Sequence, residues 1–351
     1  MTFSIEQLQQ QIQHHAESRA PLRIRGSGSK DFYGAAKHGE LIDMAAYSGV
    51  VEYEPTELVV TVRAGTSLTE LEAILAAEKQ MLPFEPPHFG GHGTIGGAVA
   101  SGLSGPRRAY AGSVRDFLLG ARIINGNGED LHFGGKVIKN VAGYDVSRLM
   151  CGAMGTLGVL LDMSFKILPL PADEVTLRYR MDQASAIEAI NRWAGQPLPL
   201  SASAYFDGTL HVRLSGAAPA VAAAQQKMGG DPVSEGPSWW NGLRDQTHGF
   251  FQTDQPLWRV SLPATAPPLA LANPQMIEWG GAQRWLTGDL DAQKLRQQVA
   301  AAGGHVTLFR GGDKGAGVFQ PLQPALAKIH RNLKNSFDPS NILNPGRLDN
   351  I

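Results

Sequence analysis

The chain lacks several features that define other classes of protein. Cys151 is the only cysteine among its 351 residues, so an internal disulfide and a cysteine-ligated iron–sulfur cluster are both excluded. No apolar run approaches the length of about 18 residues that a membrane-spanning helix needs. Residues 1–17 read as a polar helix without the apolar centre of a secretory signal. We expect a cytoplasmic protein that reaches the inner face of the cytoplasmic membrane only peripherally, through partners.

An excess of charge of one sign is also lacking. The 31 basic and 32 acidic residues give a net charge of −1, and lysine and arginine form no block. Proteins that bind nucleic acid usually carry a basic patch, so we expect no nucleic-acid partner. His88, His92, His211 and His305 lack the i, i+4 spacing of a metal site, so we expect no bound metal.

Glycine, in contrast, is abundant, with 41 residues in the chain. Residues 90–102 read GGHGTIGGAVASG, and GYD at 143–145 and GAMGTLGV at 152–159 follow. Glycine lets backbone N–H groups approach a ligand and accepts a positive φ without steric cost. Successive amides that face inward form a nest for an anion. The spacing therefore indicates a cradle suited to a diphosphate.

Two common phosphate-binding motifs do not fit these glycines. A dinucleotide fold needs G-x-G-x-x-G between a strand and a helix, but Gly26 and Gly28 are followed by Asp31 where the third glycine belongs. A P-loop needs G-x-x-x-x-G-K-[ST], and no such string occurs. Ordinary turns would explain single glycines but not four such segments in order.

Periodicity and turn signals predict an α+β protein in two parts. In the first part we expect an opening helix capped by Ser4, a helix after Ser67, and strands at residues 22–25, 50–53, 58–63, 117–124, 129–133 and 157–168. In the second part we expect helices at 184–193, 217–228, 292–302 and 322–335, and strands at 257–262, 276–279, 284–287 and 305–310, with hairpin turns at 207–208 and 280–281. The predicted domains are 1–171 and 172–335, followed by a C-terminal segment, 336–351.

The glycine segments resemble the vanillyl-alcohol oxidase family, whose members share a bipartite, PCMH-type FAD-binding domain. RGSGS at 25–29 resembles its pyrophosphate motif, TIGG at 94–97 its second flavin loop, GTLGV at 155–159 its adenosine-side strand, and NPGR at 344–347 its returning C-terminal segment. The resemblance covers about residues 4–171 and 336–348. It implies an FAD site made by Arg25, Gly26, Ser27, Gly28, Ser29, Gly91, Thr94, Ile95, Gly96, Gly97, Ser101, Gly102, Gly143, Tyr144, Gly155, Thr156, Gly158, Val159, Asn344 and Arg347.

Within the family, KNVAGYD at 139–145 resembles the branch that oxidises 2-hydroxy acids. The short chain and small second domain resemble the FAD-binding subunits of bacterial glycolate oxidase (glycolate dehydrogenase). This resemblance implies two partners, a larger flavin subunit and an iron–sulfur subunit. It also implies that glycolate is oxidised to glyoxylate and that the electrons pass through flavin to the iron–sulfur partner.

Two departures from the family pattern limit this reading. Covalent members carry a histidine in the first loop, whereas Lys30 follows Gly28 and Ser29 here, so we expect FAD to be bound non-covalently. Larger relatives carry a His-rich string in the second domain, and the nearest string here, RGGDKG at 310–315, has no histidine. Two alternatives stay open. One is a self-sufficient FAD-dependent 2-hydroxy-acid or sugar-alcohol oxidase or dehydrogenase, against which the missing histidine string argues. The other is a non-catalytic scaffold with a flavin fold, against which the intact glycine segments argue.

Oxidation of a 2-hydroxy acid needs a carboxylate anchor and a base. Arginine can clamp a carboxylate bidentately, and Arg259 and Arg310 lie on predicted strands of the second domain. Histidine can act as a base near neutral pH, and His211 also lies on a strand. Each of the three residues could instead have an ordinary structural role.

Overall fold

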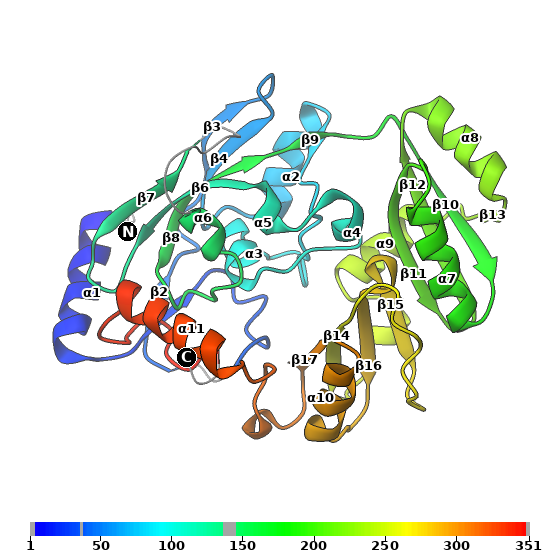
Figure 1. Ribbon diagram of the computed structural model, residues 1–351. Helices are drawn as coiled ribbons and strands as arrows, with labels where there is room; N and C mark the ends of the chain where they lie inside the picture. Colours follow the sequence, from blue (N-terminus) through cyan, green and yellow to red (C-terminus); the bar gives the residue numbers. More distant parts are fainter. Residues whose placement is uncertain (1–3, 36–37, 136–144, 349–351) are drawn as a thin grey trace.

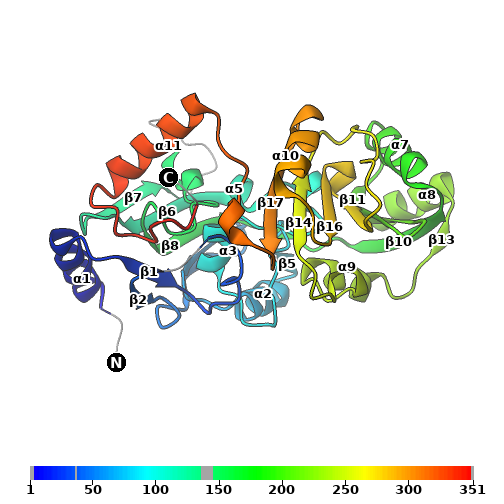
Figure 2. The ribbon, with the colours of Figure 1, turned by 90° about the horizontal axis from the view of Figure 1, so that it is seen from below.

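The computed structural model describes residues 4–35, 38–135 and 145–348 and shows two lobes side by side (Figure 1, Figure 2). The first lobe contains a five-stranded antiparallel sheet of order β3-β4-β8-β6-β7 and a parallel pair, β1 with β2. Its strands are β1 (Leu22–Arg25), β2 (Glu40–Asp43), β3 (Val50–Glu54), β4 (Val59–Arg63), β5 (Gln80–Met81), β6 (Leu118–Ile124), β7 (Asp130–Gly134), β8 (Val159–Lys166) and β9 (Leu168–Pro169). Its helices are α1 (Ile5–Ser18), α2 (Leu68–Ala77), α3 (Ile95–Ser101), α4 (Arg108–Ala111), α5 (Val114–Phe117) and α6 (Val146–Leu149).

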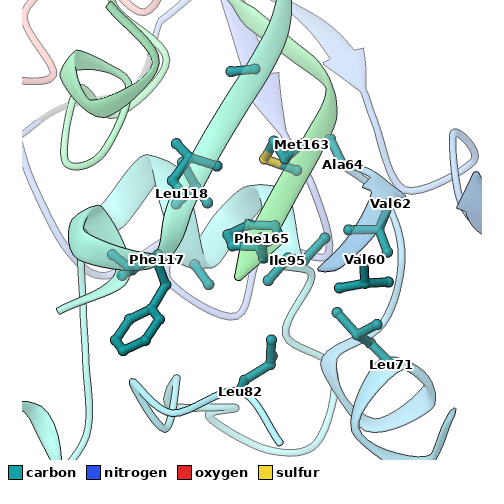
Figure 3. Close-up of a cluster of buried hydrophobic side chains, with 14 of the residues drawn as sticks. Val60, Val62, Ala64, Leu71, Leu82, Ile95, Phe117, Leu118, Met163 and Phe165 are labelled. Atoms are coloured by element: carbon teal, nitrogen blue, oxygen red, sulfur yellow. The ribbon is translucent and has the colours of Figure 1, made fainter. Parts of the chain in front are cut away.

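The core of the first lobe lies between the five-stranded sheet and α2 and α3. Val60 and Val62 of β4 and Phe165 of β8 are fully buried against Leu71 and Ile95 of these helices (Figure 3). β4 is buried at four successive positions, as expected for a central strand covered on both faces. This packing fixes the start of α3 next to the end of β4.

The second lobe is built on an eight-stranded sheet of order β13-β10-β12-β11-β15-β16-β14-β17. Its strands are β10 (Asp173–Arg180), β11 (Leu200–Phe206), β12 (Thr209–Gly216), β13 (Asp231–Pro232), β14 (Leu257–Ser261), β15 (Gln275–Glu278), β16 (Gln283–Thr287) and β17 (His305–Arg310). Its helices are α7 (Gln183–Ala194), α8 (Ala218–Met228), α9 (Gly236–Arg244) and α10 (Ala292–Ala301). All strand pairs in this sheet are antiparallel.

The last helix, α11 (Pro324–Phe337), lies against the first lobe in both views (Figure 1, Figure 2). Lys334 donates to the backbone oxygen of Thr156, and the Phe337 ring packs 6.2 Å from that of Phe133. The chain thus returns to the first lobe before residue 336. The three-part domain division itself stays an interpretation.

A cluster of ion pairs joins the two lobes. Glu85 of the first lobe accepts from Arg107 at 3.2 Å and from Arg213 of β12 at 2.8 Å. Arg107 also reaches Glu174 of β10 at 2.9 Å. Both arginines are buried, so these pairs fix how β10 and β12 sit on the first lobe.

Most expected elements are confirmed, including both hairpin turns, at Asp207-Gly208 and Gly280-Gly281. Two details are wrong. Ser67 precedes α2 but makes no side-chain capping bond. The segment expected as a second flavin loop is the first turn of α3, because Thr94 caps a helix there and its hydroxyl accepts from the Gly97 N–H at 3.2 Å.

Candidate functional site

A cavity of about 120 Å³ runs along the first lobe where β1, α3 and the C-terminal segment meet. Thirteen of the twenty residues predicted for the FAD site line it: Arg25, Gly26, Ser27, Gly28, Ser29, Thr94, Gly96, Gly97, Ser101, Gly155, Gly158, Asn344 and Arg347. The fold thus gathers segments that are more than 300 residues apart in the sequence into one cradle.

Several glycines of the cradle are required by close packing between its walls. A Cβ on Gly26 would lie 2.5 Å from Thr94 Oγ1, and one on Gly96 would lie 2.7 Å from the backbone oxygen of Ala64. Gly97 differs, because a Cβ there would meet only Thr94 Oγ1 within 4 Å, at 3.1 Å. A larger side chain at Gly97 would therefore project into the cavity.

Asn344 ties the C-terminal segment to both sides of the cradle. Its Oδ1 accepts from the Ile24 N–H at 2.9 Å, and its Nδ2 donates to the Met154 oxygen at 2.7 Å. The Gly155 Cα lies so close that a Cβ would approach Asn344 Nδ2 to 2.7 Å. These two hydrogen bonds hold the C-terminal segment against the first lobe, where the resemblance places it.

Seven predicted residues do not line the cavity as the structure describes it. Gly91 is exposed, Gly102 ends α3, and Ile95, Thr156 and Val159 are buried in the core of the lobe. Gly143 and Tyr144 lie outside the described residues. The assignment of these residues to FAD stays a prediction, whereas the neighbouring Gly155 and Gly158 do face the cavity.

The cavity wall is rich in cations, which suits a diphosphate. Arg23, Arg25, Lys30 and Arg347 line it together with one carboxylate, Asp31. Arg25 Nε lies 3.1 Å from Asp31 Oδ2. Burial lowers the pKa of Arg347 and lowers that of Lys30 to about 8. The residues present therefore fit FAD. The glycines allow the backbone N–H groups to approach the diphosphate closely, and the positively charged side chains can neutralise its charge.

Sequence reasoning missed Arg23 and the cavity-lining role of Lys30. Alternation along β1 could have placed Arg23 and Arg25 on one face, but Lys30 reaches the cavity only because of the loop that carries it. That loop is held by Arg347 and Lys314: Arg347 donates to the Ala35 oxygen at 3.0 Å, and Lys314 donates to the Phe32 oxygen at 2.7 Å.

A second, smaller cavity of about 30 Å³ lies between the lobes. Phe89 and Leu103 of the first lobe face Arg259, Gln283 and Glu278 of the second across it. Arg259 Nε donates to Gln283 Oε1 at 2.7 Å, and Gln283 Nε2 donates to Glu278 Oε2 at 3.0 Å. We call this row of three side chains the seam network.

Glu278 is the residue of the seam network that sequence reasoning missed. It is buried, and the hydrogen bonds to its carboxyl, from Gln283 Nε2 and from Trp285 Nε1 at 2.5 Å, both end on Oε2. Burial raises the pKa of Glu278 to about 7, although these donors and Arg259 oppose the shift. A carboxyl that titrates near neutral pH in a cleft is a candidate functional group.

The three predicted catalytic residues do not come together. Arg259 lines the seam cavity, as just described. Arg310 instead donates to the Phe251 oxygen at 2.8 Å and to Gln246 Oε1 at 3.4 Å. His211 stacks on Trp239 with ring centres 4.0 Å apart, and burial lowers its pKa to about 4. Of the three, only Arg259 faces one of the cavities described here.

Comparison with known proteins identifies the family. A family model described as an FAD binding domain matches residues 3–134. The glycolate oxidase subunit GlcE of Escherichia coli (strain K12) is 46% identical over 97% of this chain and 96% of its own length. The chain belongs to the GlcE family of glycolate oxidase subunits. It is therefore an FAD-binding oxidoreductase subunit.

Two further relatives of this GlcE-family chain match about half of it in sequence, and a solved structure shares the fold of nearly the whole chain. The glycolate oxidase subunit GlcD of Bacillus subtilis (strain 168) is 33% identical over 46% of this chain and 35% of its own length. The D-lactate dehydrogenase of Archaeoglobus fulgidus is 31% identical over 46% of this chain and 36% of its own length. Substrate-bound p-cresol methylhydroxylase shares the fold, with a TM-score of 0.74, 16% identity, and coverage of 99% of this chain and 88% of its own.

The described residues show neither a membrane-spanning helix nor a cluster of metal ligands. No helix among them is long and apolar enough to cross a membrane. No group of three or more histidine, cysteine, aspartate or glutamate side chains in that part of the chain could hold a metal ion.

Proposed function

We propose that this chain is the FAD-binding subunit of a glycolate-oxidising complex. In this proposal glycolate is oxidised to glyoxylate, and the electrons pass through the flavin of this chain or of a larger flavin subunit to an iron–sulfur subunit. The likeness to GlcE over almost the whole chain carries the proposal. The single cysteine supports the need for a separate iron–sulfur partner.

The cradle residues would hold FAD without a covalent bond. Arg23 and Arg25 stand beside the glycine backbone of residues 26–29, where a diphosphate would be neutralised. Asn344 and Arg347 would close the cradle from the C-terminal side. When bound, FAD supplies the two-electron acceptor, and the protein supplies position and electrostatics.

The seam network is our candidate for the substrate contact. Arg259 would anchor a carboxylate through charge-assisted hydrogen bonds, and Glu278 would accept the hydroxyl proton, for which a pKa near neutrality is suited. A cavity of about 30 Å³ is smaller than a 2-hydroxy acid. Binding there therefore requires side chains such as Phe89 to move.

Absorbance of the purified chain tests the proposal. Because the seam cavity of the chain alone is smaller than a 2-hydroxy acid, we expect flavin bands that persist when glycolate is added anaerobically to the isolated chain. We expect the bands to bleach when the two partner subunits are present. Bleaching of the isolated chain would replace the proposal with a self-sufficient dehydrogenase. A colourless chain that still binds the larger flavin subunit would indicate a scaffold.

A further inference from the structure

Lys30 places a buried ammonium group at the wall of the FAD cradle. Its Nζ is buried and has no hydrogen-bond partner among the described residues. Its Nζ lies over the Phe89 ring, 5.6 Å from the ring centre. A lysine is rarely buried unless it is paired, so this position calls for a negatively charged ligand.

Asp245, the carboxylate that raises the pKa of Lys30, is already engaged elsewhere. Asp245 raises the pKa of Lys30 against the larger effect of burial. Its Oδ2 lies 2.8 Å from Arg244 Nη2, and its Oδ1 accepts from the His88 N–H at 2.8 Å. The charge of Lys30 is therefore not neutralised by Asp245.

The loop around Lys30 is held in place from both lobes. Lys314 donates to the oxygens of Phe32 and Gly34 at 2.7 and 2.8 Å. The Phe32 ring packs edge-on against Phe89 at 5.3 Å and against Phe309 of β17 at 5.4 Å. Such support fixes the position of a charged group before a ligand arrives, which makes its field effective.

Lys30 lies where the cradle approaches the seam cavity. It lines the cradle, and the Phe89 ring beneath its Nζ lines the seam cavity. A substrate must meet the redox-active ring of FAD away from the diphosphate, so that ring belongs at this end. This step rests on the proposed function.

We propose that Lys30 supplies the positive charge beside the redox-active ring of FAD and thereby raises its reduction potential. The oxidised ring is neutral, and it becomes an anion when it takes up two electrons and one proton. A fixed cation in a poorly hydrated site stabilises the anion more than the neutral form. Lys30 would thus make the bound flavin a better electron acceptor.

The test measures the reduction potential of bound FAD against reference dyes in the full chain. We expect Lys30→Met to lower the ratio of reduced to oxidised flavin at a fixed potential by about tenfold, which is about 30 mV for a two-electron couple. Lys30→Arg, which keeps the charge, should restore most of the shift. Lys227→Met on exposed α8 removes the same charge from the second lobe and should leave the potential unchanged.

The FAD dissociation constant is measured in parallel. A loss of FAD affinity in K30M with no change in potential would assign Lys30 to the diphosphate and overturn the proposal. An unchanged potential with unchanged affinity would overturn it as well. If K30M does not fold, Lys30→Gln is compared with Lys30→Arg in the same way. Dithionite is used to reduce the flavin in these experiments, so the readouts do not depend on glycolate. If glycolate failed to reduce the complex, that result would count against the proposed function alone.

Discussion

Lys334 and Asp338 form a buried ion pair across the end of α11, with 2.5 Å between Nζ and Oδ2. Lys334 Nζ also donates to the backbone oxygens of Thr156 and Leu343. The Asp338 carboxylate accepts from the N–H groups of Ile342 and Leu343. Every polar atom of the pair is thereby used to fasten the C-terminal segment, which carries Asn344 and Arg347, to the cradle.

Loss of one partner of this pair should destabilise the protein strongly. Lys334→Met would leave a buried carboxylate without its cation, for which we expect a loss of about 3–5 kcal/mol in the free energy of unfolding. Denaturant unfolding of the FAD-free chain measures it. The exposed pair of Lys294 and Asp291 is the control, since Lys294→Met should cost less than about 1 kcal/mol. Equal losses in the free energy of unfolding for the two variants would show that the buried pair stabilises the protein no more than the exposed pair does.

The ion cluster between the lobes should behave in a similar way. Glu85→Gln removes the carboxylate that Arg107 and Arg213 share and leaves two buried guanidinium groups close together. We expect a loss of about 3–5 kcal/mol in the free energy of unfolding, and earlier proteolysis between the lobes. Asp231→Asn, which breaks the exposed pair with Arg178, is the matched control and should change little. Wild-type stability of E85Q would contradict this view of the interface.

Gly97 allows the cradle to be filled with only a small shift of one wall residue, Thr94. Gly97→Leu should give a folded but colourless chain, because its side chain would meet only Thr94 near its base and then extend into the cavity. Circular dichroism and flavin absorbance together measure this outcome. Gly195→Leu in the second lobe, where a Cβ has no contact closer than 3.7 Å, should remain yellow. A yellow G97L protein would mean that FAD does not occupy this part of the cavity.

The sequence allowed the main elements of the fold to be predicted because local rules decide them. The turn at Asp207-Gly208 has positive φ at both residues, 47° and 71°. An Asp-Gly pair between two strands predicts a hairpin turn of this kind. Local rules do not predict the start of α3, because Gly96 and Gly97 are poor helix formers. The Thr94 cap and the packing of Gly96 on Ala64 override that propensity.

The site could be predicted only in part, because burial is decided by tertiary structure. The glycine motifs located the cradle, and thirteen of the residues expected there line it. No sequence pattern marked Glu278 as a site residue, because a carboxylate at the end of a strand is usually exposed to solvent. It is buried here because Trp285 and Gln283 of the neighbouring β16 enclose it. Lys30 likewise reaches the cavity only through the contacts of its loop with Lys314 and Phe309.

The buried carboxyl of Glu278 should make stability depend on pH. Its pKa is about 7 in the folded chain, against an ordinary value of 4.5, so the folded state holds a proton that the unfolded state releases. The free energy of unfolding should therefore fall as the pH rises from about 4.5 to above 7. Glu278→Gln cannot ionise, so its stability relative to wild type should improve over this range by about 3 kcal/mol, at 1.36 kcal/mol per pKa unit. Unfolding of both proteins at pH values across this range measures the difference, and exposed Glu57→Gln is the control that should show none. A constant difference between E278Q and wild type would mean that Arg259 already balances the ionised carboxyl, and that Glu278 is charged throughout and poorly suited to take a proton at neutral pH.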